Sequence, residues 1–181
     1  MKRLFTIIIL LTGVAYFQAS AQEDHGGTLN LGLGLGGYSG YYKYVGRNFP
    51  VIHVDYEFNT GRNFTLAPFI NFYTYSNTYN WNGGNYAFRE TVIPIGIKGT
   101  YYFDELLQAS SDWDFYAAGS LGYAFANRQW ENGYNGDKNY YASGNSLFLD
   151  IHIGAEYHFN ERLGMFLDLS SGVSTIGLAL H

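Results

Sequence analysis

Residues 51–58, VIHVDYEF, alternate strictly between apolar and polar side chains. The apolar face carries Ile52, Val54, Tyr56 and Phe58, and the polar face carries His53, Asp55 and Glu57. A period of two residues is the signature of a β-strand that separates two different environments. This segment therefore predicts a strand with one apolar face and one polar, charged face.

The same alternation recurs along the chain, whereas the 3.6-residue spacing of an amphipathic helix is hard to find. The further segments run over residues 29–36, 64–74, 93–103, 113–125, 147–159, 165–169 and 176–180. With residues 51–58 they make eight predicted strands. An even number of antiparallel strands suits a closed up-and-down barrel.

The connections between the predicted strands fall into two sets. One set holds the turns Asn59–Arg62 and Asn160–Arg162 and the medium connection Asp104–Ser111. The other set holds three long connections rich in Tyr, Asn and Gly, which are Tyr38–Asn48, Ser76–Ala87 and Arg128–Gly144. Only Ser170–Gly172 in this second set is short. Short turns at one end and long loops at the other are typical of outer-membrane barrels.

Composition supports one unusual domain. The 181 residues are 19% aromatic and only 14% charged, against a usual charged share of about 25%. The absence of cysteine excludes a disulfide scaffold and a cysteine-ligated metal site. The net charge of −5 argues against a nucleic-acid partner.

The first residues have the layout of a secretory signal. Lys2 and Arg3 precede the apolar segment Leu4–Phe17, and Ala19-Ser20-Ala21 forms a small-residue cleavage site. A membrane-spanning helix needs about 20 apolar residues, which is more than this segment offers. We therefore expect residues 1–21 to be a cleaved signal peptide and residues 22–181 to be the barrel domain.

Alternation alone does not separate a membrane barrel from a soluble lipocalin-like carrier, because the two differ in which face points inward. Two features favour the membrane barrel. The polar faces carry many small residues, which suit a narrow eight-stranded lumen; they are Gly32, Gly34, Gly36, Gly96, Ala118, Ser120, Gly122, Ala124, Gly154 and Gly177. The apolar faces become aromatic near the short turns, as in an interfacial girdle; these residues are Tyr56, Phe58, Tyr101, Phe103, Trp113, Phe115, Tyr157 and Phe159.

With these features the chain resembles the small OmpA/OmpX-like outer-membrane β-barrels over about residues 28–180. The resemblance implies a closed transmembrane barrel in the outer membrane of a Gram-negative bacterium, inserted by the outer-membrane assembly machinery. Barrels of this family usually end on an outward-facing aromatic residue, whereas this sequence ends on His181. We therefore expect the natural C-terminus one residue further on. Pro68 and Pro94 lie inside predicted strands, where we expect bulges. No peptidoglycan-binding domain is expected.

The alternate residues on the polar, inward-facing side of each predicted strand place several charged groups in the lumen. The predicted polar network comprises Asp55, Glu57, Lys98, Asp150, His152, Glu156 and Asp168. Counting from the short turns places Asp55, Lys98, Glu156 and Asp168 near one depth. We expect these groups to plug the lumen, with no metal and no cofactor. The alternatives are a narrow conducting path and a metal site made by His152, Glu156 and His158.

No catalytic residue is predicted. Ser146 and Ser170 lie near loop ends, but parity and depth place no histidine base beside them. Some eight-stranded barrels modify the acyl chains of lipid A, so a lipid-modifying enzyme stays as an alternative.

Function is expected in the long loops, through a structural or surface-interaction role. Their aromatic residues could bind an extracellular ligand or could stiffen the loops by packing together; they are Tyr41, Tyr42, Tyr44, Tyr79, Trp81, Tyr86, Trp130, Tyr134, Tyr140 and Tyr141. The expected partners are outer-membrane lipid, the assembly machinery and such a ligand, with no nucleic acid.

Overall fold

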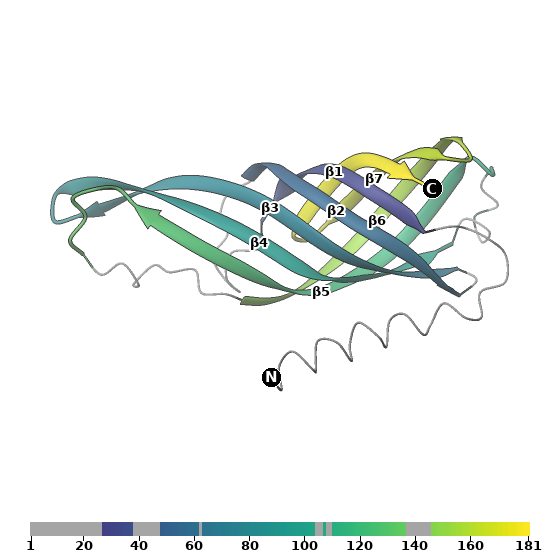
Figure 1. Cartoon of the computed structure of the whole chain (residues 1–181), viewed down its shortest axis with the longest axis horizontal. Coiled ribbons are helices and arrows are strands. Elements are labelled where there is room, and N and C mark those ends of the chain that lie inside the picture. Colours follow the sequence, from purple (N-terminus) through teal and green to yellow (C-terminus); the bar gives the residue numbers. More distant parts are fainter. Residues whose placement is uncertain (1–26, 38–47, 62, 104–106, 108–109, 137–145) are drawn as a thin grey trace, which may run out of the picture.

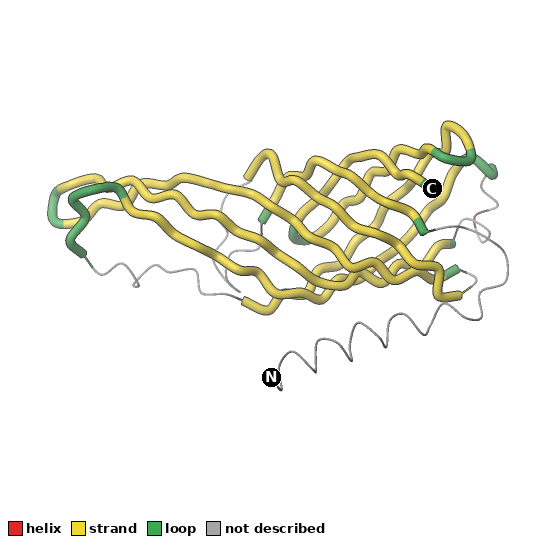
Figure 2. The backbone as a smooth tube through the Cα atoms, viewed as in Figure 1, coloured by secondary structure: helices red, strands yellow, loops and turns green. Residues whose placement is uncertain are grey.

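The protein forms a closed barrel of eight antiparallel strands in the order β1 to β8 (Figures 1 and 2). This computed structural model describes residues 27–37, 48–61, 63–103, 107, 110–136 and 146–181. The strands are β1 (Thr28–Gly36), β2 (Asn48–Gly61), β3 (Phe64–Trp81), β4 (Gly84–Tyr102), β5 (Trp113–Trp130), β6 (Ser146–Asn160), β7 (Leu163–Ser170) and β8 (Val173–Leu180). The predicted fold class is confirmed. Among the described residues, no helix has the length and apolar character needed to cross a membrane.

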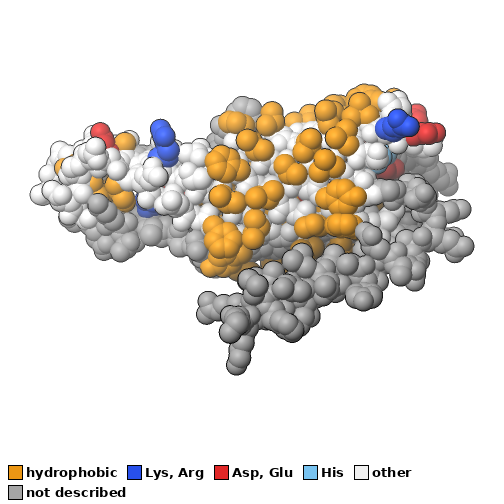
Figure 3. Space-filling view, viewed as in Figure 1, with side chains coloured by type: hydrophobic (Ala, Val, Ile, Leu, Met, Phe, Trp, Pro, Cys, Tyr) orange, Lys and Arg blue, Asp and Glu red, His pale blue; other side chains and the backbone are white. Residues whose placement is uncertain are grey.

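The apolar faces of the strands point outward. Leu149 and Ile151 on β6 are 78% and 74% exposed, whereas Asp55 and Lys98 are 2% and 4% exposed. Figure 3 shows the hydrophobic side chains gathered around the middle of the barrel. So large an apolar surface is a liability in water but matches the hydrocarbon of a bilayer. The predicted orientation, apolar outside and polar inside, is what the structure has.

The predicted girdle residues lie on the outer surface near the short turns. Tyr56, Tyr101, Trp113 and Phe159 are exposed, and Phe58, Phe103, Phe115 and Tyr157 are partly exposed. Several form ring pairs along and across strands, and the Trp113 and Tyr157 centroids lie 5.0 Å apart. Amphipathic and aromatic rings at this level suit the boundary between hydrocarbon and headgroups.

The prediction of a long loop over Ser76–Ala87 is wrong. β3 and β4 stay paired through Trp81 and Gly84, joined by Asn82 and Gly83 with φ of 50° and 80°. Positive φ at both central residues defines the tight turn that Asn-Gly favours in hairpins. The Tyr, Asn and Gly composition resembles a loop, but the cross-strand partners on β4 and β5 hold the segment as sheet.

The strands therefore differ greatly in length. β3, β4 and β5 have 18, 19 and 18 residues, whereas β7 and β8 have eight each. The long strands run beyond the rest of the barrel on the left of Figure 1. We call this part, residues 74–91 and 126–136, the strand extension.

The bulges expected at Pro68 and Pro94 are absent. Pro68 keeps its place opposite Ile97, and Pro94 keeps its place opposite Ala124, without a shift in register. A strand residue directs its N–H toward only one neighbouring strand, so a proline costs one ladder bond on that side and leaves the other ladder intact. The register shifts lie elsewhere, between Gly34 and Gly36, Asn59 and Gly61, and His158 and Asn160.

Several other predictions fall wholly or partly outside the described residues. The signal peptide, residues 38–47, most of Asp104–Ser111 and residues 137–144 are among them. Arg128–Trp130, predicted as the start of a loop, instead ends β5, because it pairs with Phe88–Glu90 on β4.

A small residue on the inner face makes room for a large one. Gly154 on β6 pairs with Tyr116 on β5, and a Cβ at residue 154 would lie 2.2 Å from Tyr116 Cζ. The Tyr116 ring occupies that space and donates a hydrogen bond of 3.1 Å to Asp168 Oδ2. Gly119, on the outer face of β5, has only Asp150 O at 3.9 Å.

Replacing Gly154 should therefore disturb the lumen. We expect Gly154→Val to displace Tyr116 and to lower the free energy of unfolding by about 1–3 kcal/mol. Urea unfolding in lipid vesicles measures this change. Gly119→Val is the matched control and should change stability by less than about 0.5 kcal/mol. Equal losses in the two variants would contradict this packing account.

Candidate functional site

A buried ammonium group lies at the centre of the lumen. Lys98 Nζ on β4 is 3.0 Å from Asp55 Oδ2, 3.6 Å from Glu57 Oε1 and 3.9 Å from Asp168 Oδ2. The four side chains come from β2, β4 and β7, and each is less than a tenth exposed. Strand alternation directs all four inward, and the closed barrel brings them to one level.

Further hydrogen-bond partners surround the two β2 carboxylates. Asn30 Nδ2 donates to Asp55 at 2.8 Å and to Glu57 at 3.2 Å. Tyr102 donates to Glu57 at 2.7 Å, and Thr65 donates to it at 2.8 Å. His53 Nε2 lies 2.9 Å from Asp55 Oδ2. Buried charges are tolerated only where their hydrogen-bonding capacity is met in this way.

A serine, a histidine and an aspartate form a second chain of contacts. Ser120 Oγ lies 2.7 Å from His152 Nε2, and His152 Nδ1 lies 2.7 Å from Asp168 Oδ1. These are the atoms and distances of a hydrolytic triad. The adjoining cavity leaves about 10 Å³ for the centre of a water molecule, which is room for one water and not for an acyl chain. The arrangement can order a water or pass a proton between neighbours.

The sequence did not predict the Ser120–His152–Asp168 contacts, because only Ser146 and Ser170 were candidate nucleophiles there. Ser170 instead donates to Asp150 at 2.9 Å. The inward parity of Ser120 and Tyr116 was available as a signal, but their contacts depend on the register between β5, β6 and β7.

Asp150 holds the β7–β8 turn. It accepts hydrogen bonds from the Ser170 and Ser171 hydroxyls and from Gly172 N at 2.9 Å. His152 Nε2 lies 3.7 Å from Asp150 Oδ2, which links this end to the Ser120 chain.

The expectation that Glu156 shares the depth of Lys98 is wrong. On β6 the partner of Glu156 is Phe166, whereas Asp168 pairs with Gly154, so Glu156 lies two positions nearer the short-turn end. Its Oε1 is 2.8 Å from His181 Nε2 and 3.9 Å from His158 Nδ1. The alternative metal set of His152, Glu156 and His158 also changes, because His152 contacts Ser120 and Asp168 and not this group.

His181 is partly exposed just beyond β8. The hydrogen bond to the Glu156 carboxylate raises the pKa of the His181 imidazole above 6.5, against the opposing effect of partial burial. The carboxylates of Asp114 and Glu57 act in the same direction as Glu156.

The strand extension has a small core of its own. Trp130 and Tyr134 stack with ring centroids 4.0 Å apart, and Tyr86 lies 5.3 Å from Tyr134. Beneath them the fully buried Glu90 pairs with Arg128, whose guanidinium lies 4.4 Å from the centre of the Phe88 ring. Of the aromatic residues predicted as loop anchors, Tyr79, Tyr86, Trp130 and Tyr134 thus pack on one another.

The outer face of the strand extension is polar. Within the barrel the outward positions of β3 and β4 are apolar, but beyond Phe72 they carry, apart from Ala87, hydroxyl, amide and guanidinium groups. Examples are Thr74, Asn80 and Asn85, and Asn80 donates to Asn85 across the strands at 3.0 Å. We call the exposed hydrophobic side chains around the middle of the barrel the apolar belt. The change from apolar to polar side chains marks where the strands leave this belt (Figure 3).

A closed eight-stranded barrel with an apolar outside and a filled polar lumen is a transmembrane β-barrel of the outer-membrane type. Its fold is that of the small OmpA/OmpX-like barrels. OprG from Pseudomonas aeruginosa is similar at a TM-score of 0.60 and 11% identity, covering 86% of this chain and 95% of OprG.

Two further structures resemble it more loosely, each at a TM-score of 0.47. The N-terminal barrel domain of Pseudomonas aeruginosa OprF is 11% identical, covering 84% of this chain and 93% of that domain. Ail, the attachment invasion locus protein of Yersinia pestis, is 8% identical, covering 85% of this chain and 96% of Ail. Comparisons with protein-family models and with curated protein sequences found no match.

Removing the central cation should leave uncompensated buried charge. We expect Lys98→Met to lower the free energy of unfolding by about 3–5 kcal/mol, because three carboxylates lose their shared partner. Urea unfolding in vesicles, followed by tryptophan fluorescence, measures the loss. Arg89→Met removes an exposed cation from the same strand and should cost less than about 0.5 kcal/mol. A loss at Lys98 no larger than at Arg89 would contradict the central role.

The raised pKa of His181 predicts a pH-dependent contribution to stability. A raised pKa means that the folded protein holds the proton more tightly, so the stabilisation is complete below about pH 6.5 and is lost as pH rises through the folded pKa. His181→Gln should therefore destabilise the barrel more at pH 5.5 than at pH 9. Unfolding in EDTA-containing buffer tests this, with His25→Gln as the control. A constant difference across pH would contradict it.

Proposed function

We propose that the protein resides in the outer membrane of a Gram-negative bacterium, reached after removal of signal peptide 1–21 and insertion by the assembly machinery. In that position it is a closed barrel without an open pore, and its strand extension is a rigid platform for an extracellular, hydroxyl-rich ligand such as a polysaccharide. The observation that carries this proposal is the continuation of paired strands beyond the apolar belt.

The strand extension contributes nothing to spanning the bilayer, so its order calls for another reason. Its inner face is held by the Trp130–Tyr134 stack and by the Glu90–Arg128 pair. Glu131 also fixes the neighbouring strand, since its carboxylate accepts a hydrogen bond of 3.0 Å from Ala87 N. A preordered platform loses little conformational entropy when it binds a partner.

The outer face supplies the chemistry for a hydroxyl-rich ligand. Thr74, Asn80, Asn85 and Arg89 are exposed there, and Thr74 Oγ1 lies 3.2 Å from Thr91 Oγ1. Amides offer both donors and acceptors, and hydroxyls can act as either, which matches the mixed character of sugar hydroxyls. Because side chains alternate along each strand, the outer face of the sheet presents these groups in a regular array.

The alternatives receive less support from the described residues. A conducting path would have to pass the Lys98 cluster, where the adjoining cavity has room for one water. A lipid-modifying enzyme would need substrate access to Ser120, which is 3% exposed. A soluble carrier would have to expose the apolar belt to water.

Trimming the strand extension tests the proposal. Ser76 pairs with Arg89, so residues 77–88 can be replaced by Asn-Gly while the barrel register is kept. We expect the trimmed protein to insert and to shift on unboiled gels like the parent, but to lose at least tenfold of its binding to a polysaccharide array. Ile151→Val, in the apolar belt, is the control. Equal binding by parent and trimmed proteins, or none by the parent, would overturn the platform role.

A further inference from the structure

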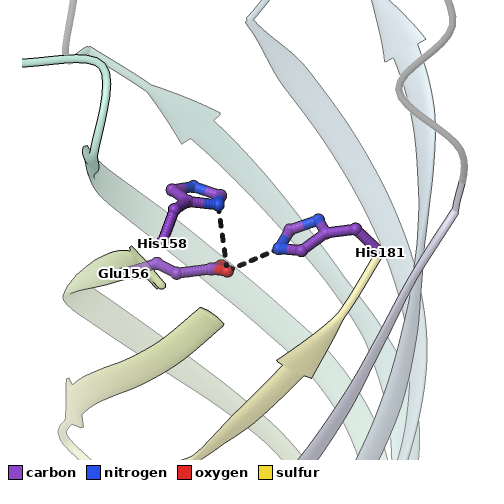
Figure 4. Close-up of side chains that lie close together, drawn as sticks. All are labelled: Glu156, His158 and His181. Carbon is purple, nitrogen blue, oxygen red and sulfur yellow. Dashed lines mark hydrogen bonds and ion pairs between the residues drawn. The ribbon is translucent and has the colours of Figure 1, made fainter. Parts of the chain in front are cut away.

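Three potential metal ligands meet at the short-turn end of the lumen, separate from the strand extension. Glu156 and His158 lie on β6, and His181 follows β8 (Figure 4). The ligand atoms of the three side chains all lie within 4.8 Å of one another. Glu156 points toward both rings, with His181 Nε2 at 2.8 Å and His158 Nδ1 at 3.9 Å from its Oε1.

Each histidine has an oxygen partner for its other ring nitrogen. His158 Nε2 lies 2.8 Å from Asp114 Oδ2, and His181 Nδ1 lies 3.1 Å from Thr28 Oγ1. When zinc displaces the proton that His181 Nε2 donates to Glu156, an N–H donated to each outer oxygen leaves a lone pair on His158 Nδ1 and on His181 Nε2, the two atoms that face Glu156. This pattern of an outer oxygen fixing the tautomer and the ring is typical of metal-bound histidines.

The spacing and exposure also suit an ion. Four-coordinate zinc with bonds of about 2.0–2.2 Å holds its ligand atoms about 3.3 Å apart, so the observed contacts need adjustments on the order of an ångström. The His158 and His181 side chains are 22% and 23% exposed, which gives access from the barrel end, while Glu156 is 7% exposed. Low exposure of the carboxylate strengthens its attraction to a cation.

We propose that Glu156, His158 and His181 form a site for a divalent transition-metal ion, with zinc as the best match. Two imidazoles and one carboxylate are a common zinc set and leave a fourth position for water. Calcium and magnesium prefer six or more oxygen ligands, which this cluster lacks. The sequence offered Glu156 and His158 only as an alternative metal set together with His152, because His181 joins them only through the pairing of β7 with β6 and β8.

The ion would clamp the barrel where it closes. β7 lies between β6 and β8, and β8 pairs with β1 to complete the cylinder. Because Thr28 belongs to β1, the ligands and their supports draw on both sides of that seam. The proposal is independent of the surface role of the strand extension.

Zinc titration of the full-length protein, refolded without a histidine tag, tests the site. Isothermal calorimetry should show one zinc per chain, and His158→Gln or His181→Gln should weaken binding at least 100-fold. Thr28→Val and Asp114→Ala, which remove the supporting oxygens, should weaken it about 10–100-fold. His25→Gln controls for nonspecific histidine binding and should leave the affinity unchanged.

A second measurement covers variants that fold poorly. In the unmutated protein, zinc should shift the ¹⁵N resonances of His158 Nδ1 and His181 Nε2 more than those of the His53 and His152 rings. Absence of saturable binding at millimolar zinc, unchanged affinity in both glutamine variants, or shifts confined to other histidines would overturn the proposal.

Discussion

The barrel depends on how one buried ammonium group is shared. An eight-stranded lumen is just wide enough for side chains, so its charges are desolvated and must be paired inside the protein. Lys98 reaches Asp55, Glu57 and Asp168, but one cation does not satisfy three carboxylates. Neutral donors complete the set; they are Asn30, Thr65, Tyr102 and Tyr116. The plug is therefore a hydrogen-bonded network rather than a set of separate ion pairs, and its members stabilise one another.

The same strand alternation that fills the lumen also produces the lipid-facing surface, and it explains what the sequence could predict. A period of two fixes the face of each residue from local information, so the eight strands and their inner and outer faces follow from the sequence. Depth does not follow in this way, because it depends on the stagger between strands. Glu156 therefore lies nearer the short-turn end than counting suggested, and the contact of Ser120 with His152 went unnoticed.

The strand extension shows a different limit of sequence reasoning. Residues 76–87 have the composition of a loop, yet the Asn82-Gly83 turn and the partners on β5 keep them in the sheet. Trp130 and Tyr134 are some fifty residues away in the chain, so a window of local sequence contains no sign of them. The outward face does carry a local signal, since its apolar residues give way to polar ones beyond Phe72. That signal marks the end of the membrane belt but not the end of the strand.

Because the strands are unequal in length, the two sides of the barrel differ in how many backbone hydrogen bonds hold them together. β3 to β5 have long ladders, whereas β1, β7 and β8 have only nine, eight and eight residues with which to close the cylinder. Polar anchors lie at both ends of this short side. Asp150 binds the β7–β8 turn at one end, and Glu156 with His181 and Thr28 joins β6, β8 and β1 at the other. Short strands have few ladder bonds to lose before they separate, so side-chain anchors at their ends contribute most where the ladders are weakest.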